Sequence, residues 1–118
     1  MEEITYTDAV LQEYKVGMGI FTEKLPDVAK AFHAFTESCF ENGKLDQKNK
    51  QLIALAISVH AHNEYCIVYH TKGCLDAGAT AEEMMEAIGV AAALGGGSAM
   101  SQGVTIWQDA LDDFTGMV

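Results

Sequence analysis

The sequence predicts an all-α protein of about six helices, folded as a single domain over residues 1–118. Apolar side chains recur at three- and four-residue steps along nearly the whole chain, which is the period of an amphipathic helix. The chain contains only one proline, so long stretches are free to be helical. Residues that favour helix N-caps occur at Asn63, Thr80 and Ser98. No repeat or linker divides the 118 residues, a length typical of one domain.

The first two helices are expected in the N-terminal third. Residues 7–23 predict a helix with an apolar face made of Ala9, Val10, Tyr14, Met18 and Phe21. Pro26 fits the first turn of the second helix, where its missing N–H costs nothing. The apolar face of that helix comprises Val28, Phe32, Phe35 and Cys39, so Cys39 is expected in the core. The segment Glu41-Asn42-Gly43 ends it with a glycine signal.

The third helix is expected after an Asp46 cap, and the fourth is expected to run to about Ala77, with Gly78 just beyond its end. The boundary between them falls near His60 to Asn63. The third helix is apolar over a wide arc, through Leu52, Ile53, Leu55, Ala56 and Val59. A chain this short has few layers to cover such a face, which predicts a homo-oligomer.

Thr80 and Glu83 have the spacing of a capping box at the start of the fifth helix. Its inward face is expected to be Met84, Ile88, Ala91 and Ala92. Gly95-Gly96-Gly97 interrupts or kinks the helix, and close helix–helix approach explains it better than a phosphate loop, which needs a preceding strand. Ser98 is expected to cap a sixth helix. The apolar face of that helix comprises Met100, Val104, Trp107, Ala110, Leu111 and Phe114.

Charge and cysteine usage exclude several functional classes. The net charge is −10, from 17 acidic and 7 basic residues, which argues against binding to nucleic acid or an anionic membrane. No secretory signal is visible at the N-terminus. Apolar runs such as Val90 to Leu94 are far shorter than the ~20 residues that span a bilayer. Three cysteines without a signal predict free thiols and a cytoplasmic location.

The residues that indicate chemistry lie near the start of the fourth helix. Cys66 and His70 are four apart and therefore neighbours on one helical face. If Asn63 is the N-cap, Cys66 is the third residue of the helix, where the dipole favours a thiolate. His70 could accept the thiol proton. The alternative is a structural cysteine beside a satisfied histidine.

A metal site is the less favoured interpretation. His62, Cys66 and His70 form an i, i+4, i+8 series of ligands that suit zinc. His62 and His70 would lie about 12 Å apart on one helix, too far to share a metal. We therefore expect no metal or cofactor. Cys74 could lie near the same cleft but is better explained as a small packing residue, and Tyr65 and Tyr69 as packing or pocket-lining residues.

Residues Lys44 to about Leu111 resemble the carboxymuconolactone decarboxylase and alkylhydroperoxidase D-like family. The matching segments are Leu45–Ala56, Asn63–His70, Ala77–Glu83 and Gly95–Gly97, in the family's order and spacing. The resemblance implies an all-α fold and an oligomer, commonly a trimer or hexamer.

The peroxidase branch of that family has a Glu…Cys-x-x-Cys-x-x-x-His site whose two cysteines cycle between dithiol and disulfide. On this sequence the second cysteine matches Cys66 and the histidine matches His70. The first cysteine falls on Asn63 and the glutamate on Gln51. Asn63 cannot resolve a sulfenic acid and Gln51 cannot act as a carboxylate base, so the two-cysteine cycle should not operate intact.

Three functions follow from these residues. The first is a thiol-dependent antioxidant hydroperoxide reductase, with Cys66 as nucleophile, His70 moving the proton, and Gln51 and Asn63 as hydrogen-bonding partners. Its resolving thiol would be Cys74, Cys39, a cysteine of another subunit or an external small thiol. The second is a decarboxylase-like enzyme that acts on a small organic acid, using His70 as acid/base and Lys72 as the nearby cation. The third is a non-enzymatic oligomeric protein that has lost the site.

Overall fold

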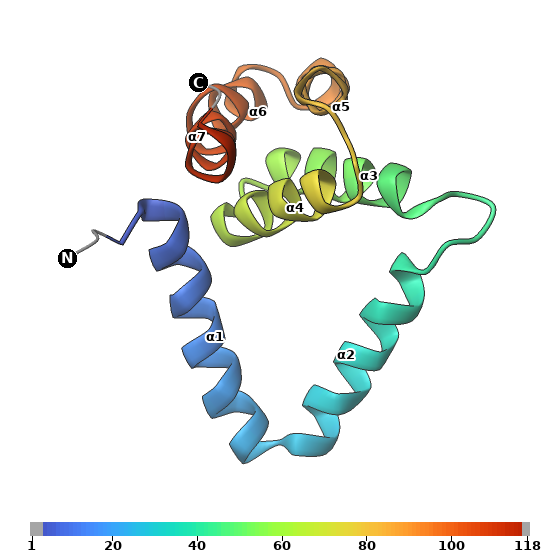
Figure 1. Ribbon diagram of the computed structural model, residues 1–118, viewed down its shortest axis with the longest axis vertical. Helices are drawn as coiled ribbons and strands as arrows, with labels where there is room; N and C mark the ends of the chain where they lie inside the picture. The colour runs from blue at the N-terminus through green and yellow to red at the C-terminus, as the bar shows by residue number, and fades with distance from the viewer. Residues whose placement is uncertain (1–3, 117–118) are drawn as a thin grey trace.

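The computed structural model describes residues 4–116, and all of its regular structure in that range is helical (Figure 1). This confirms the predicted all-α class. The elements are α1 Tyr6–Lys24, α2 Pro26–Phe40, α3 Gln47–His60, α4 Glu64–Asp76, α5 Ala81–Gly95, α6 Gly97–Gln102, the π-helical turn η1 Gly103–Trp107, and α7 Gln108–Thr115. No helix in this range is long and apolar enough to cross a membrane.

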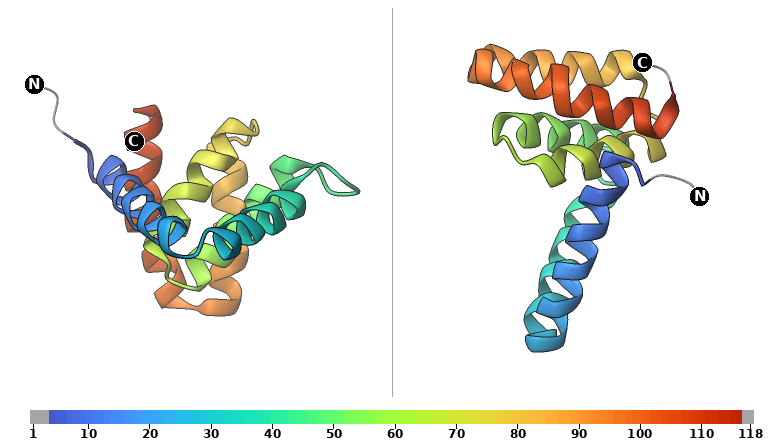
Figure 2. Two further views of the ribbon diagram at one scale, coloured as in Figure 1. Left: turned by 90° about the horizontal axis from the view of Figure 1, so that it is seen from below. Right: turned by 90° about the vertical axis from the view of Figure 1, so that its left-hand side faces the viewer.

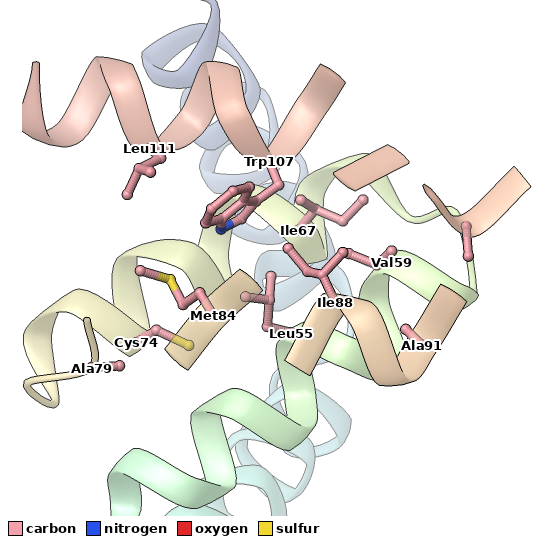
Figure 3. Close-up of a cluster of buried hydrophobic side chains, with 11 residues drawn as sticks. Leu55, Val59, Ile67, Cys74, Ala79, Met84, Ile88, Ala91, Trp107 and Leu111 are labelled. Carbon is pink, nitrogen blue, oxygen red and sulfur yellow. The ribbon is translucent and has the colours of Figure 1, made fainter. Parts of the chain in front are cut away.

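Helices α3 to α7 form a two-layered body. Helices α3 and α4 pack against each other, and α5 with the α6–η1–α7 run covers them on one side (Figure 2). Between the layers lies one cluster of buried apolar side chains, shown in Figure 3. Its largest fully buried members are Trp107, Leu55, Ile67, Met84 and Leu111. The body therefore has a hydrophobic core of its own.

Helices α1 and α2 form an arm that projects from the body. They make a V in which the N-terminal end of α1 and the C-terminal end of α2 meet the body (Figures 1 and 2). Only Thr7, Val10 and Ala29 are buried along these two helices. The expectation that the second helix buries its apolar face is wrong, because no other element between residues 4 and 116 covers it. Its members Val28, Phe32, Phe35 and Cys39 are all exposed.

The caps predicted for three helices are confirmed. The Asp46 side chain accepts a hydrogen bond from the Asn49 backbone N–H at 2.8 Å, and Asn63 accepts one from Cys66 N–H at 3.0 Å. Thr80 and Glu83 form the reciprocal capping box. Ser98, however, lies inside α6 and does not cap it. The chain turns at Gly96, whose φ of 72° favours glycine, and α6 begins at the next residue.

The C-terminal run buries a different face from the one expected. Met100 and Val104 are exposed, whereas Ala99 and Gly103 are buried. A Cβ at Gly103 would lie 2.6 Å from Ile88 Cγ2, so this glycine lets the run pack closely on α5. The π-helical turn shifts the helical phase before Trp107. A uniform 3.6-residue period that fits Trp107 therefore wrongly places Met100 and Val104 on the buried face. Of the three consecutive glycines, only Gly95 makes a close approach, to His60.

Candidate functional site

The connection between α3 and α4 sets the position of Cys66. His62 adopts the left-handed φ of 57°, and the Asn63 N–H bonds back to the Ser58 carbonyl at 3.1 Å. Asn63 then caps α4, which makes Cys66 the third residue of the helix as expected. The Cys66 backbone N–H donates its hydrogen bond to the Asn63 side chain. That amide is therefore not available to stabilise a thiolate at the start of α4.

Contacts with three other side chains hold His70 in place. Its Nδ1 lies 2.9 Å from Gln51 Oε1 on α3. Its ring stacks on Phe40 at a centroid distance of 5.6 Å and meets the edge of Tyr69 at 5.2 Å. Burial lowers the pKa of His70, so the imidazole is neutral near pH 7. Because an amide oxygen only accepts, Nδ1 carries the proton and Nε2 keeps a free lone pair.

Gly73 makes room for Gln51. It lies within α4, where a glycine costs about 1 kcal/mol relative to alanine. A Cβ at this position would collide with the Gln51 amide, coming within 2.5 Å of its Cδ. The missing side chain therefore lets Gln51 lie against α4 and reach His70. A lone glycine in a helical pattern is the local sequence signal that could have indicated this contact, which was not predicted.

The environment of the Cys66 thiol differs from the expectation. Cys66 is partly buried, and this burial raises its pKa. Between residues 4 and 116 no hydrogen bond joins the thiol to His70, whose Nδ1 is engaged by Gln51 instead. The predicted bias toward a thiolate is therefore not met in the ligand-free chain, because desolvation disfavours the charged form. Ionisation of Cys66 requires a base.

Three tyrosines form a stack beside this part of α4. Tyr14 of α1 stacks on Tyr65 with centroids 3.8 Å apart and planes 9° apart, and Tyr65 stacks on Tyr69 at 5.5 Å. Burial raises the pKa of Tyr65 well above its ordinary value, and the neighbouring Tyr14, Tyr69 and Cys66 add to the effect. Tyr65 was a predicted supporting residue. Tyr14 and Phe40 were missed, since each is far from α4 in sequence.

A cavity of about 260 Å³ opens next to Gln51. Its lining comes from one side of α3 and from the C-terminal half of α4. The residues that line it include Gln47, Gln51, Tyr69, Lys72, Gly73 and Asp76. Lys72, the cation that sequence reasoning singled out, donates to Asp76 at 2.8 Å. Neither Cys66 nor His70 lines this cavity, and Gln51, which contacts His70, is the residue that connects the cavity to the imidazole.

The other two cysteines are not brought to Cys66. Cys74 is fully buried in the core cluster of the body, where burial raises its pKa to about 12 (Figure 3). It is a packing residue, and the idea that it lies in the same cleft is wrong. Cys39 is exposed on α2. In the described residues, no three His, Cys, Asp or Glu side chains converge in a way that could hold a metal ion.

Comparison with known proteins identifies the family. The model of the carboxymuconolactone decarboxylase family matches residues 26–109, more than half of the chain. The chain belongs to the carboxymuconolactone decarboxylase family. The chain is 36% identical over 92 residues to uncharacterized protein 4 in the cox locus of Paracoccus denitrificans, covering 78% of this chain and 83% of that protein. An uncharacterized protein of Cupriavidus necator is 29% identical over 87 residues, covering 74% and 77%.

Solved structures of carboxymuconolactone decarboxylase family proteins share the fold. The apo protein from Legionella pneumophila superposes with a TM-score of 0.87 at 26% identity, covering 92% of this chain and 96% of that one. Protein TM1620 of Thermotoga maritima, for which a role in antioxidative response has been suggested, superposes at 0.71 with 25% identity, covering 90% and 94%. These similarities confirm the family resemblance found in the sequence.

Proposed function

We propose that this carboxymuconolactone decarboxylase family protein is a thiol-dependent hydroperoxide reductase of one-cysteine type. The observation that carries the proposal is the arrangement on α4. Cys66 lies in the first turn, and one turn further on His70 is held by Gln51 with Nε2 free to accept a proton. The suggested antioxidative role of the Thermotoga protein supports the same chemistry.

In the proposed reaction, His70 acts as the base that the partly buried thiol needs. Its lowered pKa keeps Nε2 unprotonated near pH 7. As the peroxide enters, Nε2 takes the thiol proton while the sulfur attacks the distal oxygen and the O–O bond breaks. The leaving alkoxide takes a proton and departs as an alcohol, and Cys66 becomes a sulfenic acid. In this scheme the hydrogen bond between Cys66 and His70, which the structure does not show between residues 4 and 116, forms when substrate binds.

The reductant in this scheme comes from outside the chain. Asn63 stands where a resolving cysteine would be and serves as a helix cap. Cys74 is fully buried, and Cys39 lies on α2, in the arm. An external thiol therefore reduces the sulfenic acid through a mixed disulfide.

A second candidate is acid/base chemistry on a small organic acid, and the cavity favours it. Lys72 lines the cavity next to Gln51, and neutral His70 could abstract or return a proton without any thiol. The two candidates differ in whether Cys66 is essential.

The deciding experiment compares Cys66→Ser with Cys39→Ser, a matched control at an exposed thiol. With cumene hydroperoxide and an external thiol, Cys66→Ser should lose at least about 100-fold in turnover, while Cys39→Ser should stay within about twofold. If Cys66→Ser consumes peroxide as fast as the parent, the thiol is not the nucleophile. The acid/base function then becomes the better explanation. If the parent chain consumes neither hydroperoxides nor small organic acids, the non-enzymatic function becomes the better explanation.

We also propose that the protein works as a homo-oligomer. The arm exposes large apolar side chains that the rest of the described structure leaves uncovered, among them Phe35, which is 66% exposed, and Ile20, which is 58% exposed. Ile53 and Ile57 on α3 are exposed as well. So many large apolar side chains left exposed are typical of surfaces that make protein–protein contacts. Further copies of the same chain are the partner we propose.

A further inference from the structure

The cavity next to Gln51 touches the side of α4 that carries the thiol at Gly73, although neither Cys66 nor His70 lines it. Cys66, His70 and Gly73 follow one another at steps of four and three residues, so they share one side of the helix. Gly73 and Gln51 belong to the cavity wall. Seven residues of α-helix separate Cys66 from Gly73, which is about 10 Å along the axis. A molecule seated in the cavity could reach Cys66 with an extended segment of about three peptide units.

The wall of this cavity carries one charge of each sign. Lys72 and Asp76 form an ion pair across one helical turn, with 52% and 65% of their side chains exposed. An exposed pair of this kind contributes little to stability, so it can open for a ligand at low cost. A ligand that takes the place of each residue in the ion pair needs a carboxylate to bind Lys72 and an ammonium group to bind Asp76. An amino-acid head group has these two charges on adjacent atoms of a single carbon.

The size and the amides of the cavity fit the same ligand. At about 260 Å³ it lies just below the range of sites for drug-sized molecules, about 300–1,000 Å³, so it suits an amino-acid group better than a nucleotide or a flavin. The side-chain oxygen of Gln51 accepts the hydrogen bond from His70, which leaves the Gln51 NH₂ group as a donor. Gln47 contributes a second amide to the wall. Both amides can bond the carboxylate or peptide oxygens of the ligand.

We infer that this cavity binds the charged amino-acid end of a small peptide thiol, which serves as the reductant of Cys66. The inference rests on the proposed function. The peptide thiol attacks the Cys66 sulfenic acid, an S–S bond forms, and the sulfenic oxygen leaves as water. A second peptide thiol then attacks the peptide sulfur, releases the Cys66 thiol and forms the peptide disulfide. Two thiols are oxidised for each hydroperoxide reduced to alcohol and water.

The binding test uses a probe that cannot react. S-methylglutathione is a tripeptide that carries an amino-acid head group and no free thiol. Titrated by calorimetry or NMR, it should bind the parent and Cys66→Ser alike. Lys72→Gln and Asp76→Asn should each weaken binding by about fivefold to tenfold. Lys30→Gln is the matched control, since it removes the same charge from exposed α2, and it should leave binding unchanged. Absent binding, or equal binding in all variants, overturns the inference.

A kinetic test then separates this inference from the proposed function. The parent should prefer glutathione over 2-mercaptoethanol as reductant, and Lys72→Gln and Asp76→Asn should lose about fivefold to tenfold of that preference. Turnover that depends on Cys66 but shows no preference between thiols overturns only the inference. No Cys66-dependent turnover, with head-group binding intact, overturns the proposed function and the reductant role together.

Discussion

The body and the arm are both built from amphipathic helices, yet they bury their apolar residues to very different extents. In α3 to α7, the apolar stripes meet one another, and Leu55, Val59 and Ile67 are fully buried. In α1 and α2 the stripes are only partly covered, and Phe32 and Phe35 remain more than half exposed. Amphipathic period thus predicts a helix and a face to be covered, but not whether the same chain covers it.

The site lies where the arm meets the body. His70 and Tyr65 belong to α4, whereas the rings stacked on them, Phe40 and Tyr14, come from α2 and α1. The arm has little core of its own but supplies part of the wall around the imidazole. Changes in the body should therefore affect folding, and changes in the arm should affect assembly and the site.

The largest expected effect is on the body. Leu55→Ala removes a fully buried side chain from the core and should lower the free energy of unfolding by about 2–5 kcal/mol. Urea denaturation followed by circular dichroism measures it. Phe35→Ala, at a position 66% exposed, should change that quantity by no more than about 0.5 kcal/mol under conditions where the protein is monomeric. Equal losses would show that the arm is as well packed as the body.

The second comparison concerns assembly. Phe35→Glu places a charge on the exposed face of the arm and should reduce the particle mass toward the 12.7 kDa of one chain, because a buried unpaired charge is not tolerated in an interface. Val90→Glu makes the same change at a 63% exposed position on α5 of the body. Light scattering at matched concentration measures both variants. Dissociation by Val90→Glu alone would place the contact on the body, and a monomeric parent would contradict the oligomer itself.

The third comparison is between two glycines that lie within helices of the body, Gly73 and Gly89. At Gly73 a Cβ would collide with Gln51, whereas at Gly89 nothing lies within 4 Å. Gly89→Ala should stabilise the protein by up to about 1 kcal/mol. Gly73→Ala should lower the free energy of unfolding by about 1–3 kcal/mol and separate Gln51 from His70. Nitrogen NMR of the imidazole should then show mixed tautomers instead of a fixed Nδ1–H form.

A double variant checks that the collision is the cause. In a Gln51→Ala background the clash is absent, so adding Gly73→Ala should cost little, a clear departure from additivity. An undisturbed His70 tautomer in Gly73→Ala would show that Gln51 finds another path to the ring.

The fourth comparison restores the residues in which this chain departs from the two-cysteine pattern. Asn63→Cys with Gln51→Glu returns a resolving thiol and a carboxylate beside His70, and should raise peroxide turnover with a dithiol reductant. Asn63→Cys also removes the α4 cap to Cys66 N–H, which should cost about 1 kcal/mol of stability. Thermal unfolding and a peroxide assay measure the two effects on the same samples. Unchanged turnover would show that the thiol pair is not what limits the parent.

Local signals carried most of what the sequence predicted correctly. Capping by Asp46, Asn63 and Thr80 depends on neighbours three residues away, and the helix period depends on one turn at a time. The pairing of Gln51 with His70 joins residues 19 apart on two helices. Local sequence patterns, which extend over one or two turns, could not predict it. The same holds for Phe40 and Tyr14. The resemblance to the family pointed to Gln51, but not to its contact or to the glycine that permits it.

The smallest expected effect lies in how the arm controls the titration of His70. Burial holds the pKa of His70 below its ordinary value of about 6.5. The unfolded chain therefore takes up the proton first as pH falls, and stability is lost from about pH 6.5 down to the folded pKa. Phe40 stacks on this ring from the arm. Removing it should let water reach the imidazole and move the pKa of His70 back toward 6.5.

Proton NMR titration of the His70 imidazole in Phe40→Ala measures this shift directly. The loss of stability as pH falls below 6.5 should also be smaller in Phe40→Ala than in the parent, whatever the variant costs in stability at pH 7. His70→Gln is the control, since it should remove this contribution to the slope altogether. Phe40→Leu keeps most of the apolar cover and should leave the pKa near that of the parent. If Phe40→Ala leaves the titration unchanged, the body alone buries His70, and the arm contributes only to assembly.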